Sequence, residues 1–178
     1  MIRSPIELPA DAADHAVARL AALATLAWMA ESLVPTPVPG LKPGIANVVV
    51  LYARFSHGLN DAVWVAFLRV LAGGILLGTF LSPGFALGLA GTTASCAALA
   101  AASALPARWF GPVGHSVLAA LAHVAGQLTF ASWWLIPPSG VLWIAPPLAA
   151  GAVVFGVVNG VVVARMLRAD PPPPVPAS

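Results

Sequence analysis

Five apolar segments, each long enough to cross a lipid bilayer as a helix, dominate this chain of 178 residues. They cover about residues 15–34, 60–81, 84–105, 111–136 and 141–167. Crossing the hydrocarbon core takes roughly 20 helical residues. A further apolar segment, residues 44–56, spans only about 20 Å at 1.5 Å per residue. We therefore expect an all-α integral membrane protein, a compact bundle of six helices with a short second helix.

Composition agrees with a membrane protein. Hydrophobic residues make up 60% of the chain and charged residues only 8%, whereas a soluble domain carries about 25% charged residues. The net charge of +2 comes without a basic cluster, which argues against binding to nucleic acid. The single cysteine, Cys96, can form no internal disulfide.

The basic residues indicate how the chain crosses the membrane. With six crossings one side holds Arg3, Arg19, Arg54, Arg108, Arg165 and Arg168. The other side holds only Lys42, and five crossings give a weaker bias. The positive-inside rule thus predicts a plasma (inner) membrane protein with both termini cytoplasmic. Residues 1–14 would form a cytoplasmic segment, 15–168 the transmembrane domain and 169–178 a disordered, Pro-rich tail.

A Pro- and Gly-rich stretch separates the first two apolar segments. It runs from Glu31 and Ser32 through Lys42 to Asn47 and cannot be helical throughout. Non-helical backbone is tolerated at membrane depth only where protein buries it or where it lines a cavity. We expect this stretch to form the first outer loop above a binding site, with Lys42 and Asn47 contacting the bound molecule.

Arg69 lies in the middle of an apolar segment. A charge at that depth costs about 2.5–3.5 kcal/mol even on insertion scales, so the side chain should face the bundle interior and be paired. Glu31 is the natural partner candidate. Two interpretations stay open at this point: a structural Arg69–Glu31 pair, or an arginine that meets an anionic ligand.

His115, His123 and Gln127 fall on one face of the segment 111–136, because helical residues four apart share a face. We expect this face to line a polar cavity, with a hydrogen bond between helices as the alternative. The two histidines are about 12 Å apart along a helix, too far to share a metal ion.

Small residues recur at spacings of four, which allows helices to approach closely in lipid. Most such pairs, Gly156 and Gly160 among them, predict packing within the bundle. Ala18 and Ala22 on the first helix also suit a docking face for another membrane subunit. The segments 84–105 and 141–167 carry almost no polar groups, which predicts a scaffold role.

Signatures of an enzyme are missing from the sequence. Asp11 and Asp14 are better explained as a helix cap than as a magnesium site. No nucleophile elbow, phosphate-binding loop or cysteine metal knuckle occurs. We expect neither catalysis, nor a cofactor, nor a bound metal.

Several motifs resemble one known family of membrane proteins. They are Glu31-Ser32, Pro39-Gly40-Leu41-Lys42-Pro43-Gly44-Ile45-Ala46-Asn47, Arg69, and His123 with Gln127. The family is labelled heptaprenyl diphosphate synthase component I and also Gx transporter, and the likeness runs from about residue 28 to 136. One departure is Val124, because the family usually has asparagine after the histidine.

The two labels imply different functions. Prenyl synthases are recognised by two Asp-rich motifs that hold magnesium, and this chain has neither. The transporter label implies a fold similar to the S components of energy-coupling-factor importers. It further implies a small, anionic or amphipathic solute bound by Lys42, Asn47, Arg69, His123 and Gln127, with ATPase-bearing partner subunits. The alternatives are a non-catalytic membrane component that assists a soluble prenyl synthase subunit, and a membrane scaffold.

Overall fold

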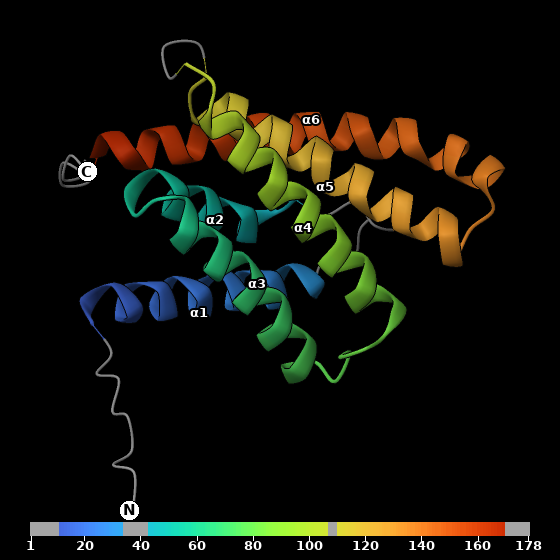
Figure 1. Ribbon diagram of the computed structural model, residues 1–178, viewed down its shortest axis with the longest axis horizontal. Coiled ribbons are helices and arrows are strands. Elements are labelled where there is room, and N and C mark those ends of the chain that lie inside the picture. The colour runs from blue at the N-terminus through green and yellow to red at the C-terminus, as the bar shows by residue number, and fades with distance from the viewer. Residues whose placement is uncertain (1–10, 34–42, 107–109, 170–178) are drawn as a thin grey trace, which may run out of the picture.

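The computed structural model describes residues 11–33, 43–106 and 110–169. These residues form six α-helices and no strand (Figure 1). The helices are α1 (Ala12–Ser32), α2 (Ile45–Ser56), α3 (Leu59–Leu76), α4 (Pro83–Ser103), α5 (Pro112–Trp134) and α6 (Pro138–Ala169). The expected all-α fold and its short second helix are confirmed. The expected loop between the first two helices lies mostly in residues 34–42, outside the described residues.

Helix α3 ends earlier than the sequence suggested, at Leu76 instead of residue 81. The chain turns there because Gly78 adopts a left-handed backbone with φ of 64°, which glycine takes without steric cost. The Ser82 hydroxyl then accepts a hydrogen bond of 3.1 Å from the Phe85 N–H and so caps α4. Local turn chemistry thus outweighs the apolar character of this stretch.

Asp11 and Asp14 form the helix cap that the sequence predicted. The Asp14 N–H donates to the Asp11 carboxylate at 2.8 Å, and the Asp11 N–H donates to the Asp14 carboxylate at 3.0 Å. This reciprocal arrangement is a capping box at the start of α1. Both carboxylates are therefore accounted for by the backbone.

The helices have the lengths and composition of a membrane bundle. Four of them, α3 to α6, are long and apolar enough to cross a membrane. Helix α1 has 21 residues but carries Asp14, Arg19 and Glu31, while α2 has only 12 residues. At 1.5 Å per residue α2 covers about 18 Å, less than the roughly 30 Å of a hydrocarbon core.

Successive helices run in alternating directions across the bundle (Figure 1). As a result the first turn of α1 and the last turn of α6 lie at the same end, on the left of the view (Figure 1). Arg54 and Arg168 belong to the last turns of α2 and α6, which also finish at that end. The turns that join α3 to α4 and α5 to α6 lie toward the opposite end (Figure 1).

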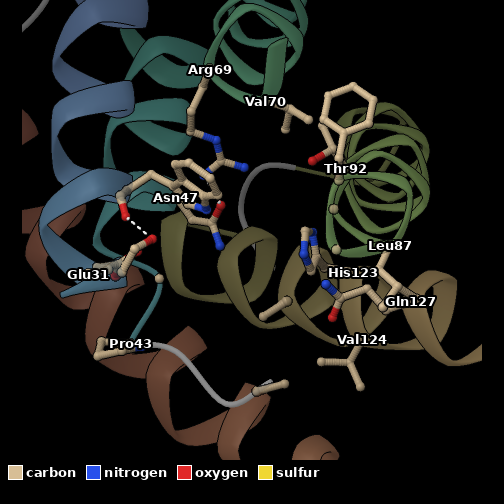
Figure 2. A pocket seen from close by; sticks show the side chains of 18 of the residues that line it. Glu31, Pro43, Asn47, Arg69, Val70, Leu87, Thr92, His123, Val124 and Gln127 are labelled. Carbon is tan, nitrogen blue, oxygen red and sulfur yellow. Dashed lines mark hydrogen bonds between the residues drawn. The ribbon is translucent and has the colours of Figure 1, made fainter. Parts of the chain in front are cut away.

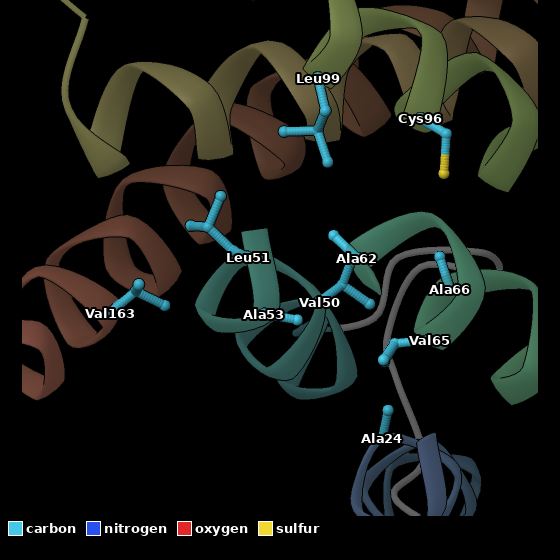
Figure 3. Packing of buried hydrophobic residues seen from close by; sticks show 10 residues of the cluster. All are labelled: Ala24, Val50, Leu51, Ala53, Ala62, Val65, Ala66, Cys96, Leu99 and Val163. Carbon is cyan, nitrogen blue, oxygen red and sulfur yellow. The ribbon is translucent and has the colours of Figure 1, made fainter. Parts of the chain in front are cut away.

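The short helix α2 is the centre of the packing. It contacts α1, α3, α5 and α6. Its buried residues Val50, Leu51 and Ala53 meet Val65 of α3 and Val163 of α6 in one hydrophobic cluster (Figure 3). Many of the cluster's residues are alanines, so helix backbones approach closely, as expected for association in lipid.

Glycines bring α5 and α6 into direct backbone contact. A Cβ atom at Gly156 would lie 2.9 Å from the Cα of Val117, and one at Gly160 would lie 2.5 Å from the Cα of Val113. Only residues without a side chain fit at such distances. The expected packing role of this pair within the bundle is confirmed.

Candidate ligand-binding cavity

A cavity of about 510 Å³ lies within the bundle, inside the range of about 300–1,000 Å³ typical of small-molecule sites. All six helices contribute to its wall, and their lining residues include Trp28, Asn47, Arg69, Thr92, His123 and Asn159. Lining residues also come from the last turn of α1, the first turn of α2 and the turn between α3 and α4. The cavity therefore lies toward the end of the bundle opposite the free ends of α1 and α6.

Side chains from α1 and α6 hold the start of α2 at the cavity wall. The Glu31 carboxylate accepts a hydrogen bond from the Ile45 N–H. The Asn159 amide donates to the carbonyls of Pro43 and Gly44, at 3.1 Å each. Glu31 thus supplies an acceptor for one of the N–H groups that a helix start leaves without a partner. Asn159 bonds the two carbonyls just before α2, so protein satisfies this irregular backbone, as membrane depth requires. The positive end of the α2 dipole is fixed at the cavity.

Arg69 reaches the cavity from the middle of α3 and is only 6% exposed. Its Nη1 donates to the Asn47 Oδ1 at 2.9 Å. Its Nε is buried and has no hydrogen-bond partner in the part of the chain that the structure describes. The Asn47 side chain holds the Arg69 guanidinium (Figure 2). The Glu31 carboxylate accepts from the start of α2, and no direct Arg69–Glu31 pair, one of the two interpretations left open, is found among the described residues. Arg69 and Glu31 still line the same cavity.

His123 and Gln127 enter the cavity from α5 and pack against Gly91 of α4. A Cβ atom at Gly91 would lie 2.7 Å from the His123 Nε2 and 2.9 Å from the Gln127 Cγ. The missing side chain at this position therefore creates the space that both residues occupy. Figure 2 shows them together below Arg69 and Thr92.

His115 does not join them, although it lies on the same helical face. It is 4% exposed, its ring packs edge-on against Phe55 at 5.1 Å between centroids, and it is not part of the cavity wall. Our expectation of a continuous polar face is wrong for this residue. His115 lies eight positions before His123, which places it about 12 Å closer to the start of α5.

Two cavity residues come from helices that we expected to be scaffold only. Thr92 of α4 is 1% exposed and Asn159 of α6 is 8% exposed, and both line the cavity. The scaffold prediction is therefore wrong for α4 and α6. Asn159 could have been found from the sequence, because a lone amide in an apolar run is costly unless it is bonded. Thr92 could not, since threonine is common in apolar helices.

Apolar and aromatic side chains form much of the remaining wall. Trp28 lies against the backbone of α3, where a Cβ atom at Gly73 would be 2.6 Å from its ring. Phe85 packs in the same way on Gly74, at 2.7 Å from a Cβ atom built there. A polar end beside an apolar body is typical of pockets for small organic molecules.

The remaining residues singled out in the sequence differ in where they lie. Ser32 lines the cavity with Glu31. Lys42 lies outside the described residues. Ala18 and Ala22 are exposed on α1, on a face that no other described helix covers. Among the described residues no group of three His, Cys, Asp or Glu side chains could hold a metal ion.

A comparison with models of protein families matches residues 20–166 to the family described as heptaprenyl diphosphate synthase component I. The match covers most of the chain. The protein belongs to this family. No curated protein and no solved structure matches the chain in the corresponding searches.

The cavity lies within the part of the chain that matches the heptaprenyl diphosphate synthase component I family. The matched range reaches from the first half of α1 to the last turn of α6. It contains every residue of the cavity wall. The cavity therefore belongs to the part of the chain that defines the family and not to an appended segment.

Proposed function

We propose that this protein binds a small, anionic or amphipathic solute in the cavity and takes part in moving it across the membrane. The observation that carries the proposal is Arg69, a buried cation at the wall of a cavity of about 510 Å³, whose Nε has no partner among the residues that the structure describes. An ionisable group inside a membrane bundle is by default a functional residue. A purely structural arginine would have its donors satisfied by protein.

Each predicted site residue has a role in this proposal. Asn47, Arg69, His123 and Gln127 contact the solute, and Lys42 closes over it from the segment that follows α1. Glu31 and Ser32 support the site, because Glu31 fixes the start of α2 and both residues line the cavity. The positive end of α2 favours an anionic group at this place.

The proposed orientation places the cavity toward the outside of the plasma membrane. Arg54 and Arg168 lie at the end where α1 begins and α6 finishes. Positive charge favours the cytoplasmic side, so both termini would be cytoplasmic. The cavity, at the opposite end, would open outward.

Transport would need energy from partner subunits, because the sequence has no nucleotide-binding motif. The exposed residues Ala18 and Ala22 offer a face of small side chains on α1, which suits close contact with another membrane helix. An energising membrane subunit with its ATPases, arranged as in energy-coupling-factor importers, is the partner that we propose.

A second function is favoured by the family description, which names a component of a synthase. In this alternative the protein is a non-catalytic membrane component that binds a soluble prenyl synthase subunit. It should co-purify with that subunit in mild detergent and raise its activity. Failure to do either would count against the alternative.

Native mass spectrometry of the gently purified protein tests the main proposal. We expect a retained small molecule, and we expect Lys42→Ala to weaken its binding with little change in melting temperature. Arg19→Ala is the matched control, because Arg19 is also a cation but bonds to the His15 carbonyl of α1, away from the cavity. Equal retention by wild type and Lys42→Ala would exclude the closing role of Lys42. Absence of any ligand that stabilises the wild type would contradict solute binding.

A further inference from the structure

Thr92 differs from two other threonines inside the helices of this protein. Thr25 donates to the Ala21 carbonyl at 2.8 Å and Thr93 to the Leu89 carbonyl at 2.9 Å. Such bonds to the preceding turn are the usual way in which a helix satisfies a hydroxyl in an apolar setting. The Thr92 Oγ1 is buried and has no partner in the described part of the chain. No described protein group uses this hydroxyl, and Thr92 belongs to the wall of the cavity.

A second buried donor, the Nε–H of Arg69, belongs to a residue that lines the same cavity. Its Nη1 is bonded to Asn47, which leaves the Nε–H on another side of the planar guanidinium without a partner in the described residues. Figure 2 shows the Thr92 hydroxyl and the Arg69 guanidinium directed toward the gap between α3 and α4. Leaving two buried donors unsatisfied costs about 1–3 kcal/mol each, so a bound group that accepts from both would be strongly favoured.

We propose that the Arg69 Nε–H and the Thr92 hydroxyl bind the carboxylate of an amphipathic monocarboxylate. Two donors match the two oxygens of a carboxylate, and guanidinium geometry suits that planar group. The inference rests on the proposed solute-binding function and names the chemical class of the solute. The apolar body of the molecule lies against Trp28 and Phe85, which line the same cavity.

Charge balance favours a single negative charge over a phosphate or diphosphate. Among the described residues of the wall, Arg69 is the one cation and Glu31 the one anion. Glu31 repels every negative charge on a ligand, so a ligand with one negative charge is opposed less than a ligand with two. A phosphate monoester carries about −1.5 to −2 and three acceptor oxygens, more than this pair of donors can satisfy.

The test compares three probes that share one apolar body: 2-naphthylacetate, the neutral 2-(2-naphthyl)ethanol and 2-naphthyl phosphate. Binding to the protein in lipid nanodiscs is measured by equilibrium dialysis, with empty nanodiscs as the blank. We expect the carboxylate to bind the wild type at least about tenfold more tightly than the alcohol, as expected for a charge-assisted hydrogen bond. The phosphate should bind more weakly than the carboxylate.

Thr92→Val and Thr93→Val form a matched pair of variants. Thr92→Val removes the hydroxyl at nearly constant shape and should weaken carboxylate binding about tenfold or more. Its melting temperature without ligand should stay equal to that of the wild type or rise, because a buried, unpartnered hydroxyl is lost. Thr93→Val should leave binding within about twofold, since this exposed hydroxyl is bonded to Leu89.

Arg69→Lys adds a variant that keeps the charge but not the guanidinium geometry. It should reduce the preference for the carboxylate over the alcohol. If the wild type shows no such preference, or if Thr92→Val binds the carboxylate like the wild type, the carboxylate site is wrong. A retained molecule in native mass spectrometry without carboxylate preference contradicts only this inference. A protein that retains nothing and binds no probe contradicts the proposed function as well.

Discussion

Gly91 of α4 offers the most quantitative test of the cavity geometry. A Cβ atom there would lie 2.7 Å from the His123 Nε2 and 2.9 Å from the Gln127 Cγ. Real Cβ atoms essentially never approach other heavy atoms closer than 3.0 Å. The substitution Gly91→Ala therefore forces both side chains away from α4 and into the cavity.

Two terms of opposite sign set the stability of Gly91→Ala. Alanine gains about 1 kcal/mol over glycine in a helix interior, whereas overpacking costs about 1–3 kcal/mol. Gly88→Ala in the same helix has only the first term, because a Cβ atom there meets nothing within 4 Å. The difference between the two variants removes the common helix term. We expect Gly91→Ala to be less stable than Gly88→Ala by about 1–3 kcal/mol.

Reversible unfolding in mixed micelles with sodium dodecyl sulfate, followed by helical circular dichroism, measures this difference. A difference below about 0.5 kcal/mol, the size of an ordinary surface effect, would refute the close contact of α4 with His123 and Gln127. Ligand binding supplies a second readout. If His123 and Gln127 contact the solute, Gly91→Ala weakens binding even in conditions where the variant is fully folded.

The same unfolding assay tests two further contacts. Glu31→Ala should lower the free energy of unfolding by about 1–2 kcal/mol, because the Ile45 N–H at the start of α2 loses its acceptor. Glu31→Gln keeps an acceptor oxygen and should lower it by about half as much. Equal losses in the two variants would contradict this role of Glu31. Gly160→Ala should lower the free energy of unfolding by about 3 kcal/mol, more than Gly91→Ala. Its Cβ atom would lie 2.5 Å from the Cα of Val113, and a backbone atom cannot move to another rotamer as a side chain can. A Gly160→Ala variant as stable as Gly88→Ala would show that α5 and α6 pack differently.

The fold was largely predictable from the sequence because one constraint dominates it. Backbone polar groups in lipid must be satisfied within the segment, so each apolar run becomes a helix that covers most of that run. Prolines and glycines then mark the ends, as at Pro83 and Pro112, which begin α4 and α5. The end of α3 was missed, because the turn depends on Gly78 and the Ser82 cap within a run that stays apolar.

Of the cavity, the sequence could predict only those residues whose polar side chains are costly in an apolar segment. Arg69, His123 and Gln127 stand out in apolar segments, and the structure places them on one cavity wall. His115 was misplaced because a helical face gives the direction of a side chain but not its depth. Thr92 was missed because it differs from other threonines only in that its buried hydroxyl has no partner among the described residues, and this depends on the surrounding helices.

The shortness of α2 explains why a cavity exists at this end of the bundle. A helix of 12 residues is shorter than a hydrocarbon core by about 12 Å. Asn47 lies in its first turn, and Glu31 and Asn159 contact the backbone at its start. The start of α2 at this depth requires partners, and Glu31 and Asn159 provide them. The shortness of α2 thus brings a helix start, with Asn47 in its first turn and its partners Glu31 and Asn159, to the cavity wall.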